Sequence, residues 1–291
     1  MGRLENGKWI DQWHNTKETK GRYVRKPSIY RNWITKDGAA GPSGKDGFKA
    51  EKDRYHLYVS WACPWAHRTL IFRAIKGLED IISISVVNAI MRSHGWTFDD
   101  GQGVIADSVN NKKYLYEVYL KEDQNYSGRV TVPLLWDKKT STIVNNESAD
   151  IIRMFNSEFD DIGANPGNYY PEAKRTAIDD MNDYIYLNIN NGVYRSGFAT
   201  TQEAYNEAIE TLFLGLDKLD SILSHQKYLI GDEITESDWR LLPTLLRFDS
   251  VYHGHFKCNK KKIKEYDNLY NYAKELYQYP GISDTYDDEY S

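Results

Sequence analysis

The sequence predicts an α/β domain followed by an all-helical domain, that is, an α/β plus all-α fold. Residues 53–156 alternate short apolar segments with helical patterns, whereas the patterns after residue 172 are all helical. Between these two parts, residues 157–171 are rich in Gly, Asn, Pro and Asp, a composition typical of a linker. The chain has 291 residues, which is enough for two domains of ordinary size.

The start of the chain is polar, and Gly and Pro cluster between residues 38 and 47. We therefore expect residues 1–50 to form an extended N-terminal arm with little secondary structure of its own. The α/β domain is expected over residues 51–156 and the linker over residues 157–171. The helical C-terminal domain is expected over residues 172–291.

The α/β part contains the elements of a thioredoxin-like domain in the order of that fold. Tyr55–Val59 is short and rich in aromatic and β-branched residues, which predicts a strand. The pattern is helical from Pro64 to Gly77, and Ile81–Val87 is an apolar run typical of a strand buried on both faces. The remaining elements are a long polar insertion over residues 88–126, a hairpin of Val130–Trp136 with Thr142–Val144, and a short helix over Ser148–Asn156.

Four helical segments are expected in the C-terminal domain. Two are amphipathic stretches over Ala173–Asn190 and Gln202–Ser224. A third is the apolar run Leu241–Phe248, which a capping box at Thr235–Asp238 opens. The last segment, Asn268–Tyr279, ends at a Pro-Gly pair.

Cys63 lies between the first predicted strand and the first predicted helix. Pro64 suits the first helical turn, where its missing N–H would have no partner. The unpaired amides and the dipole of the helix then face the sulfur and favour the thiolate, so we expect a pKa below the free value of about 8.5. The second cysteine of a redox pair would stand at Ala66, so an outside thiol must resolve any mixed disulfide. The alternative is a small buried residue that happens to precede a helix.

Composition excludes several classes of function. A net charge of -5 provides no basic field for nucleic acid, so we expect no nucleic-acid partner. The sequence contains no apolar run of about 18 residues and no apolar signal core after Met1, so we expect no membrane association and a cytoplasmic location. The chain has only two cysteines, which fits a reducing compartment. His253, His255 and Cys258 have metal-ligand side chains, but one cluster rarely makes a closed site, and we expect no metal.

A thioredoxin-like domain followed by an all-helical domain resembles the architecture of the glutathione transferases. Val132-Pro133 lies where such domains carry a cis-proline, which exposes the backbone of residue 132 for pairing with a peptide such as glutathione. A carboxylate at Glu147 suits the ammonium group of glutathione, and Ser148 with the helix-start amides suits its carboxylate. The alternatives are a trans proline that opens an edge strand and an ordinary helix start with Ser148 as N-cap.

Two further side chains are candidates for ligand contacts. Arg129 lies shortly before Val132 and can hold a carboxylate with two hydrogen bonds, although a surface position is the alternative. Trp96 lies in the long insertion and can form a flat wall over the sulfur of Cys63. Its alternative role is to pack the insertion against the domain.

Several motifs together resemble the glutathionyl-hydroquinone reductases, the Xi class of glutathione transferases. The resemblance covers about residues 30–285 and is carried by motifs within Gly47–Glu51, Arg54–Arg68, Asn145–Ser148, Asn190–Gln202 and Arg247–Cys258. It implies a cysteine nucleophile at Cys63, a tyrosine that gives or takes a proton at Tyr194, and a tyrosine that favours the thiolate at Tyr252. The glutathione contacts that it implies are Trp96, Arg129, Val130, Thr131, Val132, Glu147 and Ser148. The family's tyrosine-rich tail is not matched by residues 283–291.

These assignments predict a reductase that removes glutathione from glutathionyl-hydroquinones through a mixed disulfide between Cys63 and glutathione. The products are hydroquinone and oxidised glutathione. The partners are then glutathione, as co-substrate, and a glutathionylated aromatic substrate, with no tightly bound cofactor and a homodimeric assembly. Two alternatives stay open: an omega-like thiol transferase or dehydroascorbate reductase, and a non-catalytic binding module on the transferase fold.

Overall fold

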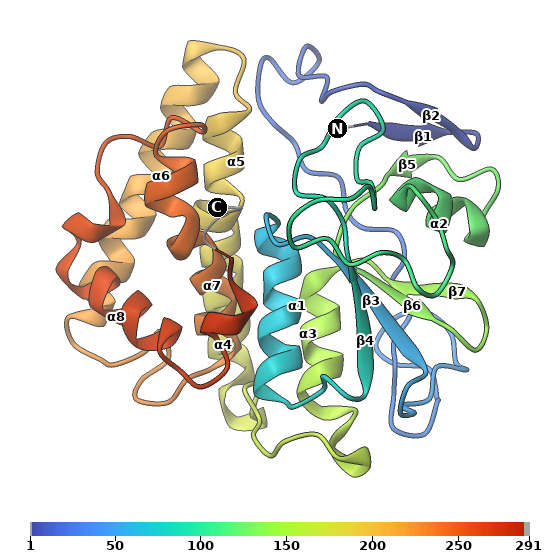
Figure 1. Cartoon of the computed structure of the whole chain (residues 1–291). Helices are drawn as coiled ribbons and strands as arrows, with labels where there is room; N and C mark the ends of the chain where they lie inside the picture. The colour runs from blue at the N-terminus through green and yellow to red at the C-terminus, as the bar shows by residue number, and fades with distance from the viewer. Residues whose placement is uncertain (1, 288–291) are drawn as a thin grey trace. The chain divides into compact units, whose positions relative to one another are not determined.

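The computed structural model describes residues 2–287, which divide into two compact units (Figure 1). The first unit contains the residues up to Trp13, Pro27–Gly167 and the residues from Asp284, and the second contains His14–Lys26 and Asn168–Ser283. The predicted fold class is confirmed, because the first unit contains a mixed sheet with helices and every regular element described within the second is a helix.

A four-stranded mixed sheet lies at the centre of the first unit. Its strands are β3 (Tyr55–Val59), β4 (Ile82–Val86), β6 (Leu134–Asp137) and β7 (Thr142–Asn145). The helices of this unit are α1 (Pro64–Ile75), α2 (Leu115–Glu122), α3 (Ser148–Ser157) and the 3₁₀-helix η1 (Asp160–Ile162). The strand order is β4-β3-β6-β7. β3 pairs parallel with β4 and antiparallel with β6, and β6 pairs antiparallel with β7. α1 and α3 pack against each other (Figure 1).

Most elements of this unit agree with the sequence prediction. β3 has the predicted bounds and is buried along its whole length. α1 starts at Pro64, and Gly77 follows its end with φ +60°, a left-handed conformation that glycine adopts at little cost. The predicted start of the hairpin strand at Val130 is wrong, because β6 begins at Leu134. Pro133 has no N–H to give to a ladder, so regular pairing starts after it.

The start of the N-terminal arm forms a hairpin, so the expectation of little secondary structure is wrong there. β1 (Arg3–Glu5) and β2 (Lys8–Ile10) pair antiparallel, and β1 also pairs with β5 (Gly128–Arg129), in the order β2-β1-β5. Asn6-Gly7 forms the turn, with φ values of 45° and 75°. An Asn-Gly pair is a strong two-residue hairpin signal, because both positions require positive φ.

The predicted insertion folds around the buried carboxylate of Asp107. This carboxylate accepts a hydrogen bond of 2.9 Å from the Tyr58 hydroxyl in β3. It also accepts hydrogen bonds from backbone amides within residues 109–112. The tyrosine-rich residues Tyr114–Tyr119 that follow form the N-cap and most of helix α2. The insertion is therefore an ordered loop and helix attached to the central sheet.

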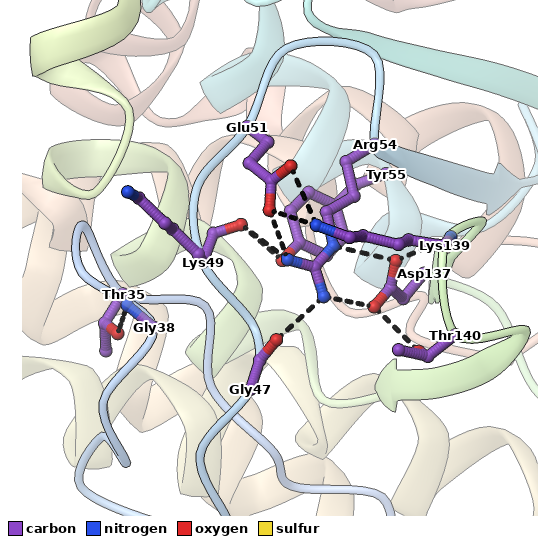
Figure 2. Close-up of polar contacts among 10 residues, drawn as sticks. All are labelled: Thr35, Gly38, Gly47, Lys49, Glu51, Arg54, Tyr55, Asp137, Lys139 and Thr140. Carbon is purple, nitrogen blue, oxygen red and sulfur yellow. Dashed lines mark hydrogen bonds and ion pairs between the residues drawn. The ribbon is translucent and has the colours of Figure 1, made fainter.

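A buried ion pair fastens the later part of the arm to the central sheet (Figure 2). The guanidinium of Arg54 donates to both carboxylate oxygens of Asp137, at 2.9 and 2.6 Å. The same group donates to the carbonyls of Gly47 and Lys49 and to the Glu51 carboxylate. The side chain of Arg54 is 5% exposed and that of Asp137 is fully buried. Such a bidentate pair holds two strands and the arm in one arrangement.

A second buried polar contact joins β3 to β4. His56 is fully buried, and its two ring nitrogens lie 2.7 Å and 2.9 Å from the hydroxyls of Ser83 and Ser85. Burial lowers the pKa of His56 from 6.5 to about 4. The imidazole is therefore neutral at physiological pH and links neighbouring strands through hydrogen bonds.

We expect this histidine to make stability depend on pH. The unfolded chain binds a proton at His56 with the ordinary pKa of 6.5, whereas the folded chain does so only near 4. The free energy of unfolding should therefore fall as the pH drops from about 6.5 to about 4, by up to about 3 kcal/mol. Urea unfolding at several pH values measures this slope. His56→Gln should reduce it, and an unchanged slope in that variant would contradict the assignment.

The second unit is built from helices in the predicted order. It contains η2 (Glu172–Lys174), α4 (Arg175–Ile185), the π-helix η3 (Tyr186–Asn190), α5 (Gly192–Gly197), α6 (Gln202–Leu223), α7 (Glu236–Arg247), the π-helix η4 (Phe248–Tyr252), η5 (Ile263–Glu265) and α8 (Asp267–Tyr277). The last described helix, η6 (Ser283–Thr285), begins at the final residue of this unit. The predicted capping box opens α7, with the carboxylate of Asp238 accepting from the Thr235 N–H at 2.7 Å. The predicted segment Ala173–Asn190 consists of α4 followed by a π-helical turn.

The last described residues belong to the first unit and contact α1. Thr285 Oγ1 lies 2.9 Å from Nε2 of the buried His67. The ring of Tyr286 stacks on that of His67, with 5.7 Å between the ring centroids. These contacts attach the C-terminal segment to the helix that begins next to Cys63.

Candidate active site

Cys63 occupies the N-cap position of α1, as the sequence predicts. Its backbone is extended, with φ -89° and ψ 114°, and Pro64 takes the first helical position. The Cys63 carbonyl accepts the first helical hydrogen bond from the His67 N–H at 2.9 Å. The thiol is half-buried and not part of a disulfide. A sulfur in this position lies at the positive end of the helix dipole, where a thiolate is favoured.

The segment before Pro133 lies beside this sulfur. Cys63 Sγ is 3.6 Å from the Val132 carbonyl oxygen, and the Val132-Pro133 peptide bond is cis, as predicted. Among the described residues, the N–H of Val132 has no hydrogen-bond partner. The side chains of Val130 and Val132 are buried, whereas Thr131 is half-buried. The backbone at Val132 therefore has a free donor next to the thiol, as pairing with an extended peptide requires.

The second glutathione motif lies at the start of α3. Glu147 is the N-cap, and its carboxylate accepts from the Ala149 N–H at 3.3 Å and from the Ser28 hydroxyl at 3.0 Å. The alternative in which Ser148 is the N-cap is therefore wrong. Ser148 is the first helical residue, and its hydroxyl is buried without a hydrogen-bond partner in the part of the chain that the structure describes. A buried hydroxyl without a partner is costly unless a ligand completes it.

Arg129 and Trp96 have structural contacts of their own. Arg129 lies in β5 and donates from Nη1 to the carbonyls of Gly2 and Gln12, at 3.2 and 2.9 Å. It therefore holds the N-terminal hairpin, and binding of a ligand carboxylate stays a prediction. Trp96 is 8% exposed, and its carbonyl accepts from the Leu115 N–H. Such burial fits the role of packing the insertion down, and a contact with glutathione stays a prediction.

The contribution of the N-terminal arm to this region was not predicted from the sequence. The Ser28 hydroxyl contacts the Glu147 carboxylate, and the Asn146 N–H donates to the Tyr30 carbonyl at 3.1 Å. Arg31 forms a bidentate ion pair with Asp150 in the first turn of α3. The arm sequence has no periodic pattern that predicts these contacts, because they are single long-range pairs rather than parts of a regular element.

Tyr194 lies in the second unit within a cluster of aromatic rings. It is half-buried on helix α5, although no helix was predicted from the sequence at this position. Its ring lies 5.5 to 6.5 Å from those of Phe256, Phe198, Tyr252 and Tyr23. A methyl group on Gly197 would lie 2.2 Å from the Phe256 ring, so only glycine permits this packing. The cluster provides an apolar and aromatic surface around one phenol group.

Tyr252 and Cys258 are two buried residues of the second unit that follow α7 in the chain. Tyr252 is 2% exposed at the end of η4, and its ring lies 6.2 Å from that of Tyr194. Its predicted effect on the Cys63 thiol stays a prediction. Cys258 is fully buried, and burial raises the pKa of its thiol to about 12. A thiol with such a pKa carries almost no thiolate at neutral pH and is a poor nucleophile.

The described residues contain neither a metal-binding cluster nor a membrane-spanning helix. Within residues 2–287, no group of three or more His, Cys, Asp or Glu side chains is arranged to hold a metal ion. Over the same residues, no helix is both long enough and apolar enough to cross a membrane.

Comparison with known proteins agrees with the geometry. Residues 62–158 match the model of the glutathione S-transferase N-terminal domain, and residues 202–275 match that of the C-terminal domain. The chain is 57% identical over 286 residues to the glutathionyl-hydroquinone reductase YqjG of Escherichia coli strain K12, with 98% of this chain and 87% of that protein covered.

Two solved structures extend this likeness to the fold. The glutathione-bound structure of YqjG from Escherichia coli K-12 has a TM-score of 0.91 and 53% identity, and the match covers 99% of this chain and 88% of that one. The Xi class transferase of Natrialba magadii has a TM-score of 0.90 and 44% identity, over 100% of this chain and 86% of that one. The chain therefore belongs to the glutathionyl-hydroquinone reductases, the Xi class of the glutathione transferase family.

Proposed function

We propose that this protein uses glutathione to reduce glutathionyl-hydroquinones and that Cys63 is the residue that reacts. The observation that carries the proposal is the half-buried thiol at the start of α1, 3.6 Å from the carbonyl of Val132, whose N–H has no hydrogen-bond partner within residues 2–287. A peptide that pairs with Val132 brings its own cysteine sulfur close to this thiol.

In the first step, the Cys63 thiolate attacks the sulfur that joins glutathione to the aromatic ring. A new S–S bond forms, the bond between sulfur and ring carbon breaks, and the electron pair of that bond stays on the ring carbon. The carbon then takes a proton, which we assign to the Tyr194 hydroxyl, and hydroquinone leaves. The aromatic cluster around Tyr194 supports this role, because it suits an aromatic substrate.

In the second step, the thiolate of a free glutathione attacks the mixed disulfide on Cys63. Oxidised glutathione leaves, and the Cys63 thiolate is regenerated. The aromatic ring has gained two electrons and the two glutathione sulfurs have lost two, so the overall reaction is balanced. A serine or tyrosine at this position would stabilise bound glutathione thiolate for conjugation instead, whereas a cysteine favours the disulfide route.

The remaining candidates receive binding roles. Val132 pairs with the backbone of glutathione, and Thr131, Val130 and Arg129 support that segment from the preceding residues. The buried Ser148 hydroxyl, which has no partner among the described residues, supports a role in holding the ligand's α-carboxylate. Trp96 is proposed to cover the ligand and Tyr252 to favour the thiolate of Cys63.

Glu147→Ala tests the glutathione site. The carboxylate of Glu147 is the proposed partner of the glutathione ammonium group. Its loss should weaken glutathione binding by about 1.5–3 kcal/mol, that is, roughly 10- to 150-fold in Kd by calorimetry. Glu158→Ala is a matched control, because Glu158 lies at the other end of α3 and also bonds to the arm, through the Lys36 N–H. Equal Kd values for parent and Glu147→Ala would rule out this site.

Substrate preference, assembly and location complete the proposal. Comparison of a glutathionyl-hydroquinone with dehydroascorbate as substrates separates the reductase from an omega-like enzyme. We expect the glutathionyl-hydroquinone to be turned over faster than dehydroascorbate. Glutathione acts as co-substrate without a tightly bound cofactor. We assign the protein to the cytoplasm. We also assign it a homodimeric state, which sedimentation of the purified protein can test.

A further inference from the structure

One buried hydroxyl connects the two segments that make up the proposed glutathione site. Tyr119 lies in α2 and is fully buried. Its hydroxyl donates to the Thr131 carbonyl at 2.9 Å and accepts from the Thr131 N–H at 3.3 Å. It also accepts from Nδ2 of Asn146 at 3.3 Å. No role for this residue was predicted from the sequence.

The partners of this hydroxyl are the direct neighbours of the proposed ligand contacts. Thr131 immediately precedes Val132, whose carbonyl lies beside the Cys63 sulfur. Asn146 immediately precedes Glu147, the N-cap of α3. The Asn146 side chain is itself held, since its Oδ1 accepts from the Tyr30 N–H at 3.3 Å.

The Tyr119 hydroxyl is protonated, and the position of its side chain is fixed by packing. Burial raises the pKa of Tyr119, so the group keeps its proton and can donate to the Thr131 carbonyl. The ring packs against those of Tyr30 and Tyr126, with centroids at 6.0 and 5.2 Å, and these two rings also stack on each other. A side chain that is locked by packing sets the positions of its hydrogen-bond partners.

We infer that Tyr119 is a positioning residue, which sets the spacing between the backbone of Val132 and the carboxylate of Glu147 so that one glutathione molecule reaches both. The inference rests on the proposed glutathione site. The ligand is held at its backbone by one segment and at its ammonium group by the other, so the distance between the segments determines its affinity. The hydroxyl does not touch the reacting sulfur, so the chemical step itself does not depend on it.

Tyr119→Phe removes the hydroxyl and keeps the ring. We expect the Kd of glutathione and its KM to rise about five- to tenfold, with kcat within about twofold of the parent value. A merely structural role would not separate KM from kcat at a temperature where the protein stays folded. The rate of Cys63 alkylation against pH should keep its midpoint, because the helix start around the thiol is unchanged.

Two matched tyrosine variants serve as controls. Tyr30→Phe alters a ring in the same cluster, and the Tyr30 hydroxyl has no hydrogen bond within residues 2–287. Tyr55→Phe removes another buried hydroxyl, which donates to the Lys49 carbonyl at 2.7 Å and not to Thr131 or Asn146. Both variants should bind glutathione within about twofold of the parent. An equal weakening in Tyr55→Phe would show that any lost buried hydrogen bond has this effect, and the inference would fail.

A double-mutant cycle tests the connection without relying on one variant. Asn146→Ala breaks the other end of the link and should also weaken glutathione binding. Combined with Tyr119→Phe, its effect should be clearly less than additive, because both changes remove the same connection. Full additivity, or a Kd for Tyr119→Phe within about twofold of the parent, would overturn the inference.

Glu147→Ala separates this inference from the proposed function. If Glu147→Ala weakens glutathione binding and Tyr119→Phe does not, only the role of Tyr119 is wrong. If the parent protein fails to bind glutathione, or Glu147→Ala binds it as the parent does, the proposed site is wrong and the role of Tyr119 falls with it.

Discussion

Cys63→Ser should lower the rate of glutathionyl-hydroquinone reduction by at least about a thousandfold. A serine hydroxyl can take the place of the thiol at the start of α1, but it cannot form a disulfide with glutathione. Reductase assays with purified parent and variant measure the effect. The serine variant should retain glutathione affinity, since the proposed contacts at Val132 and Glu147 do not involve the thiol. Weak conjugating activity in this variant would fit a hydroxyl that stabilises glutathione thiolate.

Cys258→Ser is the control for this experiment. Cys258 is fully buried in the second unit, and burial raises the pKa of its thiol to about 12. It should therefore contribute no nucleophile, and the variant should reduce substrate at the parent rate. Reduction by Cys63→Ser at the parent rate would disprove the mechanism. Loss of activity in Cys258→Ser, with Cys63→Ser still active, would show that Cys258 is the reacting thiol.

Asp137→Asn should destabilise the fold by about 3–5 kcal/mol in urea unfolding. The substitution leaves the guanidinium of Arg54, which is 5% exposed, without its bidentate carboxylate (Figure 2). Burial opposes the ionisation of Asp137, but hydrogen bonds from Arg54, Thr140 and the Lys139 amide outweigh it and lower its pKa. This contribution to stability is therefore present at neutral pH and is lost only as the pH falls through that lowered pKa.

A surface ion pair in the same unit is the matched control. Lys138 Nζ lies 2.6 Å from Asp53, whose side chain is 83% exposed. Asp53→Asn should cost less than about 1 kcal/mol, because exposed pairs contribute little. Faster hydrogen exchange of the arm near Gly47 is expected only in Asp137→Asn, since Arg54 also binds that segment. Equal unfolding free energies for Asp137→Asn and the parent would show that the buried pair does not fasten the arm.

Elements with a local signal were predicted well. The aromatic and β-branched residues of Tyr55–Val59, the proline at the start of α1 and the box at Thr235–Asp238 each fix a boundary through neighbours in the chain. The N-terminal hairpin also had such a signal at Asn6-Gly7, but its short strands have little apolar alternation. Its pairing with β5 depends on residues far along the chain, which no local pattern contains.

The candidate site was predicted only where its chemistry has a motif. Cys63 with Pro64 could be interpreted from the residues alone, because a thiol at a helix start has a distinct electrostatic environment. Tyr194 entered only through the family resemblance, since one tyrosine among 23 has no distinguishing neighbours. Tyr119 was missed because its role depends on hydrogen bonds to Thr131 and Asn146, residues that sequence patterns do not connect.

Mass spectrometry of the trapped intermediate tests the central claim most directly. The protein is incubated with a glutathionyl-hydroquinone in the absence of free glutathione, digested without reductant, and its peptides are mapped. We predict one added glutathionyl group per chain, on the peptide that contains Cys63, and its release as oxidised glutathione when glutathione is added. An adduct on Cys258, or release of hydroquinone with no adduct on either cysteine, would contradict the account.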